Sequence, residues 1–250
     1  MKKKIALALT ITTIFLGLAQ SPASASALCG PSGSSPFFNV GRVDLSGSPV
    51  TNTRGLAADI EVYNMYLKPV ISASNWSWTP LYIWNNSDTD DYIEYGVWRE
   101  RFVSGYGDPT VKVIWYNDGL KSYHDIGVFS SGYHRLKFWN NNLDNNKWYF
   151  QVDGVTQWTM PAFDSFVSGR GYAAVERTDE CNTGYGEFID TWRYSGTNLA
   201  WFELGDYSVV WHDMSACCGG DNNSHFNSQT TAADYWYTYC VAPEGCTKSS

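Results

Sequence analysis

The sequence predicts an all-β protein, an antiparallel β-sandwich with a disulfide-stapled segment at its C-terminal end. Short runs rich in Val, Ile, Tyr, Phe and Trp recur along the chain and are separated by Gly, Asn, Asp and Ser, which is the pattern of strands and turns. Within several runs apolar and polar residues alternate, as in strands with one buried face. Six cysteines, most of them close to the C-terminus, are the third observation.

The first 27 residues are typical of a secretory signal peptide. Three lysines precede an apolar stretch that begins at Ile5, and small residues end the segment. The stretch is shorter than the roughly 20 residues that a membrane-spanning helix needs. We therefore expect a secreted chain, residues 28–250, that folds as one β-sandwich domain with a cysteine-rich portion at 196–250. A lipid anchor at Cys29 is the alternative, and Leu28 disfavours it because lipoprotein signals place a small residue there.

The acidic charge of the secreted chain excludes several kinds of partner. Removal of the three N-terminal lysines leaves about 14 basic and 25 acidic residues, a net charge of about −11. Nucleic acid binding requires clusters of Lys and Arg that neutralise phosphates, so we expect no nucleic acid partner. No second apolar stretch is long enough to span a bilayer, so we also expect no membrane insertion. We expect the secreted chain to be a monomer.

The cysteines predict disulfides, because their number is even and the chain is exported to an oxidising environment. Spacing alone does not select a pairing, but four of the six lie near the C-terminus, which indicates a locally stapled segment. The alternative is a zinc site built from Cys217, Cys218, His212 and His225, which adjacent cysteines fit poorly. The six candidate disulfide cysteines are Cys29, Cys181, Cys217, Cys218, Cys240 and Cys246.

The strands can be followed in order along the chain. The stretch from Thr51 to Leu67 is ambiguous, because its apolar residues fit either a helix or a pair of strands. The next runs alternate clearly and end in turns: YIEYGVW, VKVIWYNDG, HRLKFW and KWYFQVDGV. The later runs keep the same spacing of strand and turn: GYAAVER, GEFIDTWRYS, LAWFEL, YSVVWH and YWYTYCV.

One segment carries a resemblance to a known fold. Tyr133–Gly154, YHRLKFWNNNLDNNKWYFQVDG, resembles the paired strands of concanavalin A-like jelly rolls, where a His-x-Leu strand precedes a Trp-x-x-x-Val-Asp-Gly hairpin. Asp153 and Gly154 can supply the positive φ angles of a tight turn. The resemblance implies that the sandwich is a jelly roll. Alternate residues of the two strands can then face its core: Leu136, Phe138, Trp148, Phe150 and Val152.

The strand order between Asn75 and Tyr194 is similar to that of the glutamic peptidases, the eqolisin and neprosin-like group. In that family a glutamine and a glutamate meet in a cleft, where the glutamate acts as general base on a water and the glutamine stabilises the oxyanion. The strand IEYGV matches the glutamine strand and places Glu94 there, and YAAVER matches the glutamate strand and places Glu176. Glu94 departs from the family pattern, because an ionised carboxylate cannot donate a hydrogen bond to an oxyanion.

Two glutamates on facing strands are also candidate catalytic residues of an acidic hydrolase without the glutamine. Like charges held close together raise one pKa, which leaves one proton donor and one ionised base. Such a pair would also suit glycoside cleavage. The alternative is that Glu94 and Glu176 face solvent or pair with Arg99, Arg101 or Arg177. A shared open cleft would favour an enzyme, whereas arginine partners or a wide separation would disfavour one.

Aromatic residues make up 16% of the chain, more than a core of this size requires, so some should be exposed. Exposed Trp and Tyr beside Asn and Asp are typical of sugar-binding faces, because rings stack on pyranoses while amides and carboxylates bind hydroxyls. Carbohydrate binding is the function we expect first, a Glu94/Glu176 hydrolase second, and a structural envelope protein third. The candidate ligand-binding residues are Trp76, Trp78, Trp84, Trp98, Trp115 and Tyr116.

The loop from Asn85 to Asp91 gathers the oxygen ligands that calcium prefers, with Asp88, Asp90 and Asp91 as candidate metal ligands. It is not an EF-hand, because it lacks the glycine and the terminal glutamate of that motif. A solvated acidic turn is the alternative. We expect no other cofactor.

Overall fold

The computed structural model describes residues 39–44, 52–63, 67, 75–85, 91–118, 120–163, 166–177, 185–203, 210–213, 226–232 and 235–240. The strands in this part of the chain form two antiparallel sheets of eight strands each. The predicted all-β antiparallel sandwich is therefore confirmed. Among the same residues no helix is long and apolar enough to cross a membrane.

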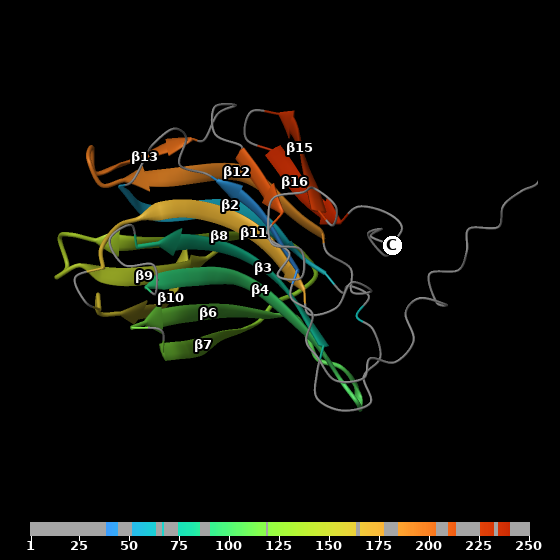
Figure 1. Cartoon of the computed structure of the whole chain (residues 1–250). Helices are drawn as coiled ribbons and strands as arrows, with labels where there is room; N and C mark the ends of the chain where they lie inside the picture. Colours follow the sequence, from blue (N-terminus) through green and yellow to red (C-terminus); the bar gives the residue numbers. More distant parts are fainter. Residues whose placement is uncertain are drawn as a thin grey trace, which may run out of the picture.

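The first sheet has the strand order β14-β1-β11-β3-β4-β6-β7, and β5 pairs with β4. Figure 1 labels β11, β3, β4, β6 and β7 of this sheet. Its strands are β1 (Asn39–Asp44), β3 (Asn75–Trp84), β4 (Tyr92–Phe102), β5 (Gly105–Tyr106), β6 (Thr110–Asn117), β7 (Leu120–Val128), β11 (Arg170–Arg177) and β14 (Val210–Asp213).

The second sheet has the strand order β10-β9-β8-β2-β12-β16-β15, and β13 pairs with β12. Its strands are β2 (Thr53–Val62), β8 (Gly132–Asn141), β9 (Lys147–Val152), β10 (Val155–Met160), β12 (Tyr185–Ser195), β13 (Ala200–Glu203), β15 (Phe226–Ala232) and β16 (Tyr235–Cys240). Strands from the C-terminal portion thus join both sheets.

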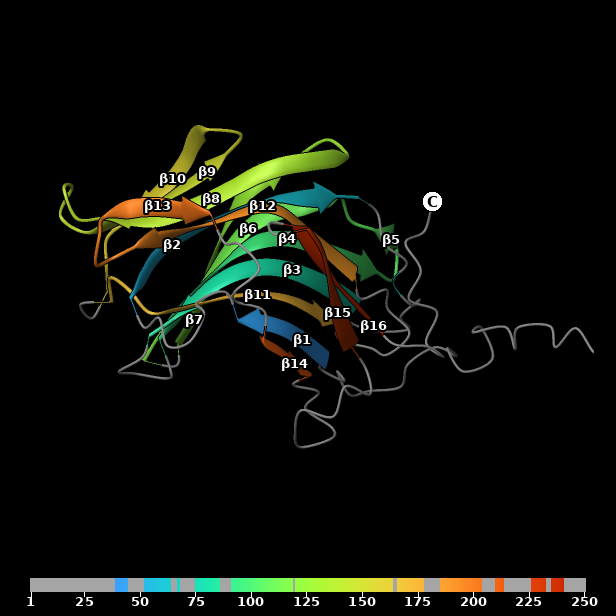
Figure 2. The ribbon, with the colours of Figure 1, turned by 90° about the horizontal axis from the view of Figure 1, so that it is seen from above.

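The two sheets lie face to face as two layers (Figure 2), and one continuous core fills the space between them. The alternation seen in the sequence explains this arrangement, because successive side chains of a strand point to opposite faces. On β4, Ile93, Tyr95 and Val97 are fully buried in the core. The residues between them, among them Glu94, therefore point away from the second sheet.

Within the ambiguous stretch from Thr51 to Leu67, residues Thr53–Val62 form a central strand, β2, rather than a helix. β2 lies between β8 and β12 and pairs with both along most of its length. Leu56, Ala58 and Ile60 all point into the core. Every second residue of this segment is therefore buried, which is the period of a strand and not of a helix. Pairing with β8 on one side and β12 on the other selects the extended conformation for these residues.

The jelly-roll segment folds as its resemblance implies. The five residues expected to face the core from β8 and β9 are all buried there. Asp153 and Gly154 form the tight turn between β9 and β10 with φ angles of 50° and 79°. His134 and Asp153 bond to each other at 2.7 Å between Nδ1 and Oδ2, and this contact fastens the turn to β8.

β3 and β4 approach each other closely where Pro80 pairs with Gly96. Pro80 has no N–H to donate to the ladder. A Cβ atom at position 96 would lie only 2.1 Å from the carbonyl oxygen of Thr79, so only glycine fits there. Glycine at position 96 therefore allows the backbones of β3 and β4 to approach closely at the centre of the first sheet.

Candidate functional site

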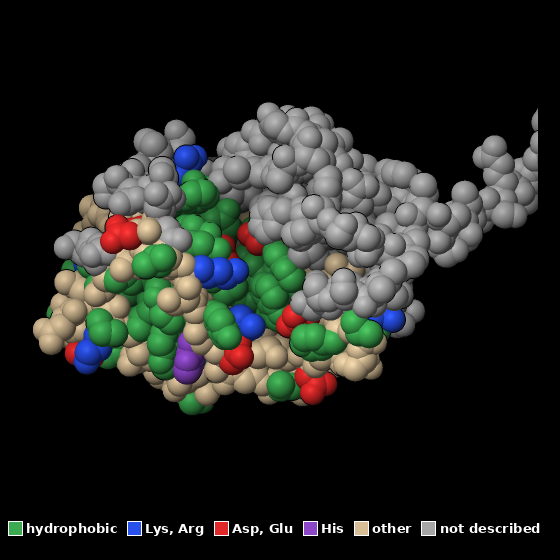
Figure 3. Space-filling model, turned by 60° about the horizontal axis from the view of Figure 1, so that its bottom comes forward, with side chains coloured by type: hydrophobic (Ala, Val, Ile, Leu, Met, Phe, Trp, Pro, Cys, Tyr) green, Lys and Arg blue, Asp and Glu red, His purple; other side chains and the backbone are tan. Residues whose placement is uncertain are grey.

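The outer face of the first sheet carries a hollow of about 210 Å³. Side chains of β3, β4, β6, β7 and β11 line it, and hydrophobic side chains surround basic and acidic ones on this face (Figure 3). Both candidate catalytic glutamates and five of the six candidate ligand-binding aromatics take part. The lining residues are Trp76, Trp78, Tyr82, Trp84, Tyr92, Glu94, Trp98, Ile114, Tyr116, Lys121 and Glu176.

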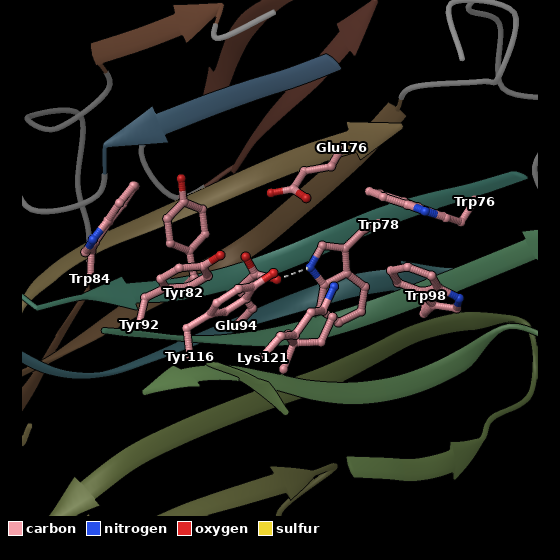
Figure 4. Close-up of a pocket in the computed structure, with 11 residues that line it drawn as sticks. Trp76, Trp78, Tyr82, Trp84, Tyr92, Glu94, Trp98, Tyr116, Lys121 and Glu176 are labelled. Carbon is pink, nitrogen blue, oxygen red and sulfur yellow. Dashed lines mark hydrogen bonds between the residues drawn. The ribbon is translucent and has the colours of Figure 1, made fainter. Parts of the chain in front are cut away.

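Glu94 projects from the middle of β4, where strand alternation turns it away from the core. Its side chain is nevertheless only 8% exposed, because the neighbouring rings cover it. Trp78 donates a hydrogen bond from Nε1 to Oε2 of Glu94 at 2.9 Å (Figure 4). Burial raises the pKa of Glu94, and the Trp78 hydrogen bond and the charge of Lys121 lower it in part.

Glu176 projects from β11, on the other side of β3, into the same hollow. It lies directly across from Trp78 in the strand register and is also 8% exposed. Burial raises the pKa of Glu176 well above its ordinary value, and the charge of Glu94 raises it further. The two carboxylates therefore interact through their charges, and the pair holds a proton at pH values where free glutamates would both be ionised.

Lys121 completes the polar part of the site and was not singled out from the sequence. Among the described residues that line the hollow it is the only cation. It comes from β7, the edge strand, and its charge lowers the pKa of both Glu94 and Glu176. Its neighbour in the register is Tyr116, whose ring centroid lies 5.8 Å from the ammonium nitrogen.

The arginines considered as partners of the glutamates are engaged elsewhere. Arg99 donates from Nε to the carbonyl oxygen of Tyr63 at 2.8 Å and is buried. Arg101 donates from Nη1 to the carbonyl oxygen of Leu67 at 2.7 Å. The side chain of Arg177 lies outside the described part of the structure. The sequence-based alternative of ion pairing is therefore wrong for Arg99 and Arg101.

Aromatic rings occupy both ends of the hollow, with the carboxylates and Lys121 between them (Figure 4). At one end Trp76 stacks on Trp98 with ring centroids 4.7 Å apart. At the other end Tyr92 stacks on Tyr116 at 4.2 Å, and Trp84 packs against Tyr92 at 5.4 Å. An extended ligand that crosses the carboxylates would meet flat apolar surfaces on both sides.

Two of the candidate aromatics differ from the expectation of an exposed, ligand-facing ring. Trp78 is fully buried and acts as a hydrogen-bond donor to Glu94 rather than as a stacking surface. Trp115 points to the other face of β6, where it packs against the core and lies 5.4 Å from Trp158 between ring centroids. The expectation for Trp115 fails because it is one residue out of phase with Tyr116 on the same strand.

The predicted calcium loop is only partly described. Asp91 is 2% exposed, and its carboxylate accepts hydrogen bonds from the backbone N–H of Asp118 at 3.0 Å and from Asn85. Asp88 and Asp90 lie outside the described residues. Within the described part no group of three or more His, Cys, Asp or Glu side chains could hold a metal ion. Calcium binding at this loop stays a prediction.

The cysteine predictions fall outside the described side chains. Cys240 lies in β16, but its side chain is not described, and the other five cysteines lie outside the described residues. The same holds for the zinc alternative and for the N-terminal signal segment. The disulfide staple and its connectivity stay predictions.

Comparison with known proteins places the fold. The structure is similar to scytalidoglutamic peptidase, solved with transition-state analogues, at TM-scores of 0.51 and 0.52, with 12% sequence identity over 82% of this chain and 98% of that one. The chain has the concanavalin A-like jelly-roll fold. A β-glucanase from Bacillus licheniformis is also similar, at a TM-score of 0.35 and 11% identity over 84% of this chain and 86% of that one.

A carbohydrate-binding module from Bacillus subtilis matches over 58% of this chain and 80% of its own length, at 12% identity and a TM-score of 0.34. No protein family and no curated protein matches the sequence itself. The fold alone therefore does not assign a substrate, and the site has to do so.

Proposed function

We propose that the chain is a secreted hydrolase that cleaves peptide bonds with Glu94 and Glu176. The observation that carries the proposal is that two buried, mutually interacting carboxylates share one open hollow. A shared cleft in which the described arginines, Arg99 and Arg101, bond elsewhere is the arrangement that favours an enzyme over a binding protein. The order of the two functions expected from the sequence is therefore reversed.

The two carboxylates have different surroundings, which gives them different roles. Trp78 donates its N–H to Glu94, and a donor of this kind favours the ionised form of its acceptor. When the pair holds one proton, the negative charge thus resides on Glu94 and the proton on Glu176. We assign Glu94 as the general base and Glu176 as the general acid, the reverse of the role that the peptidase resemblance implies for Glu176.

Hydrolysis then proceeds in two steps. Glu94 takes a proton from the attacking water, the water oxygen bonds to the carbonyl carbon, and the π electron pair of the carbonyl moves to its oxygen. In the second step that pair re-forms the C=O bond, the C–N bond breaks, and Glu176 gives its proton to the leaving nitrogen. A proton passes from Glu94 back to Glu176 before the next turnover.

A peptide substrate is supported by the similarity to a glutamic peptidase over nearly all of that protein's length. Glycan binding or cleavage in the same hollow is the second candidate, because the rings at both ends offer surfaces on which sugars stack. Both candidates place the ligand across Glu94 and Glu176, so one assay with two substrate classes separates them.

The test is to incubate the mature protein with a denatured protein and with mixed polysaccharides between pH 3 and pH 8 and to follow cleavage by mass spectrometry. We expect peptide cleavage whose rate rises with pH as Glu94 ionises and falls as Glu176 loses its proton. Because the pKa of each carboxyl is raised, both midpoints should lie above the ordinary glutamate value of 4.5. Absence of all cleavage would contradict the proposal and favour pure binding.

A further inference from the structure

The carboxylate pair leaves one requirement of hydrolysis unmet. The carbonyl oxygen gains a negative charge when water attacks, and hydrolases provide hydrogen-bond donors for it. Glu94 is engaged with the attacking water, whose proton it accepts in that step, and the proton of Glu176 is needed by the leaving nitrogen. The N–H of Trp78 is already bonded to Glu94. A different group has to face the oxyanion.

We propose that the ammonium group of Lys121 is the donor that binds the oxyanion in this hollow. This inference rests on the proposed hydrolase function and names a catalytic residue that its carboxylate chemistry does not include. Lys121 would take the place that a glutamine side chain has in the glutamic peptidases.

The position of Lys121 fits this role. Its side chain extends from the β7 side toward Glu94 and Trp78, while Glu176 approaches from the opposite side (Figure 4). Tyr116 is its partner in the strand register, and the Tyr116 ring lies beside the ammonium group at the wall of the hollow. A substrate carbonyl held between the two carboxylates would therefore have the ammonium group on its open side.

The charge of Lys121 is available for a substrate. Among the described residues no carboxylate lies within 4.0 Å of its ammonium group, as an ion pair would require. Lys112 on the neighbouring strand differs, since its ammonium group lies 3.1 Å from Oδ1 of Asp125. The charge of Lys121 acts on Glu94 and Glu176 across the hollow, but its ammonium group forms an ion pair with neither of them.

The surroundings of the hollow strengthen a contact between the ammonium group of Lys121 and an oxyanion. Lys121 itself is exposed at the sheet edge, but Glu94 and Glu176 are each only 8% exposed among the rings of the hollow, so its charge acts on a place from which water is largely excluded. The titratable groups that line the hollow together with Lys121 are Glu94, Glu176, Tyr92, Tyr116 and Tyr82. Burial and then the charge of Glu94 raise the pKa of Tyr92, so its phenol stays neutral and the two carboxylates dominate the pH response.

The experiment compares wild type, Lys121→Met and Lys121→Arg in steady-state cleavage of one peptide, with Lys137→Met as the matched control. Methionine keeps the apolar stem and removes the charge. Lys137 lies on the second sheet, with its ammonium nitrogen 4.4 Å from the ring centroid of Trp201, so its replacement also removes a lysine that packs on a ring. Thermal melting verifies that each variant is folded.

We expect Lys121→Met to lower kcat by roughly 10²- to 10³-fold with little change in KM, the usual cost of losing an oxyanion donor. Lys121→Arg should recover part of kcat, and Lys137→Met should match wild type. Loss of the Lys121 charge should also move the acidic limb of kcat/KM to higher pH, because that charge lowers the pKa of Glu94. The shift of the limb reports the charge of Lys121 beside Glu94, and the fall of kcat at the optimal pH reports the loss of the oxyanion contact.

The outcomes separate the two proposals. An active wild type, together with a Lys121→Met variant whose kcat at the optimal pH is unchanged, would overturn the role of Lys121 and leave the hydrolase intact. A wild type that cleaves nothing would overturn both. Equal losses in Lys121→Met and Lys137→Met would also count against Lys121, since they would show a general effect of removing a lysine.

Discussion

Replacing Glu176 with glutamine is expected to slow hydrolysis strongly while leaving the fold intact. Glutamine has nearly the same shape but no acidic proton, so the leaving nitrogen would depart unprotonated. Loss of a general acid costs roughly 10²- to 10⁴-fold in rate. The measurement is kcat/KM for a peptide substrate of wild type and Glu176→Gln across the active pH range.

Glu203→Gln serves as the control for this comparison. Glu203 is exposed on β13 of the second sheet, so the same chemical change there should leave kcat/KM as in wild type. Cleavage by Glu176→Gln at the wild-type rate would rule out Glu176 as a catalytic residue and return carbohydrate binding to first place.

Glu94→Gln is the sharper of the two substitutions, because the two readings of the site predict opposite results. It creates the glutamine and glutamate pair that the glutamic peptidases carry. If Glu94 is the base, as its bond from Trp78 indicates, the variant loses the group that accepts the proton of water. We expect kcat to fall by roughly 10²-fold or more.

Retained activity in Glu94→Gln would point to the other assignment of base and acid. If Glu94→Gln stays active, Glu176 must be the base, and the site works as the family resemblance implies. The pH profile then distinguishes the mechanisms further. A single remaining carboxylate would give an acidic limb without the contribution of a second, coupled glutamate.

The fold could be predicted from the sequence because alternation and turn residues carry most of the information for a sandwich. The run YIEYGVW shows which residues enter the core, and its phase places Glu94 on the outer face. The stretch 51–67 could not be settled in this way. Its apolar residues fit two periods, and only pairing with β8 and β12 selects one.

The candidate site was predictable in part. Glu94 and Glu176 were found through a resemblance of strand order, because residues about 80 positions apart give no local signal that they meet. Lys121 was missed because a lysine after an Asn-Asp-Gly turn is typical of any exposed strand edge. Trp115 and Tyr116 look alike as adjacent aromatics, and only the phase of β6 separates the core ring from the ring in the hollow.

The buried carboxylate pair also has a thermodynamic consequence for the whole molecule. In the folded state the pKa of both Glu94 and Glu176 is raised, whereas in the unfolded chain each returns to about 4.5. Above pH 4.5 the folded protein therefore binds more protons than the unfolded one, and its free energy of unfolding falls as the pH rises toward the folded pKa values.

Thermal melting at pH 4.5 and pH 8 measures this linkage. We expect a higher Tm at the acidic pH, and a smaller difference in Glu94→Gln, which has one carboxylate fewer to ionise in the hollow. A pH-independent Tm difference between the two proteins would show that the carboxylates ionise as freely as in the unfolded chain. The burial that raises both pKa values thus also makes the folded protein more stable at acidic pH than at pH 8.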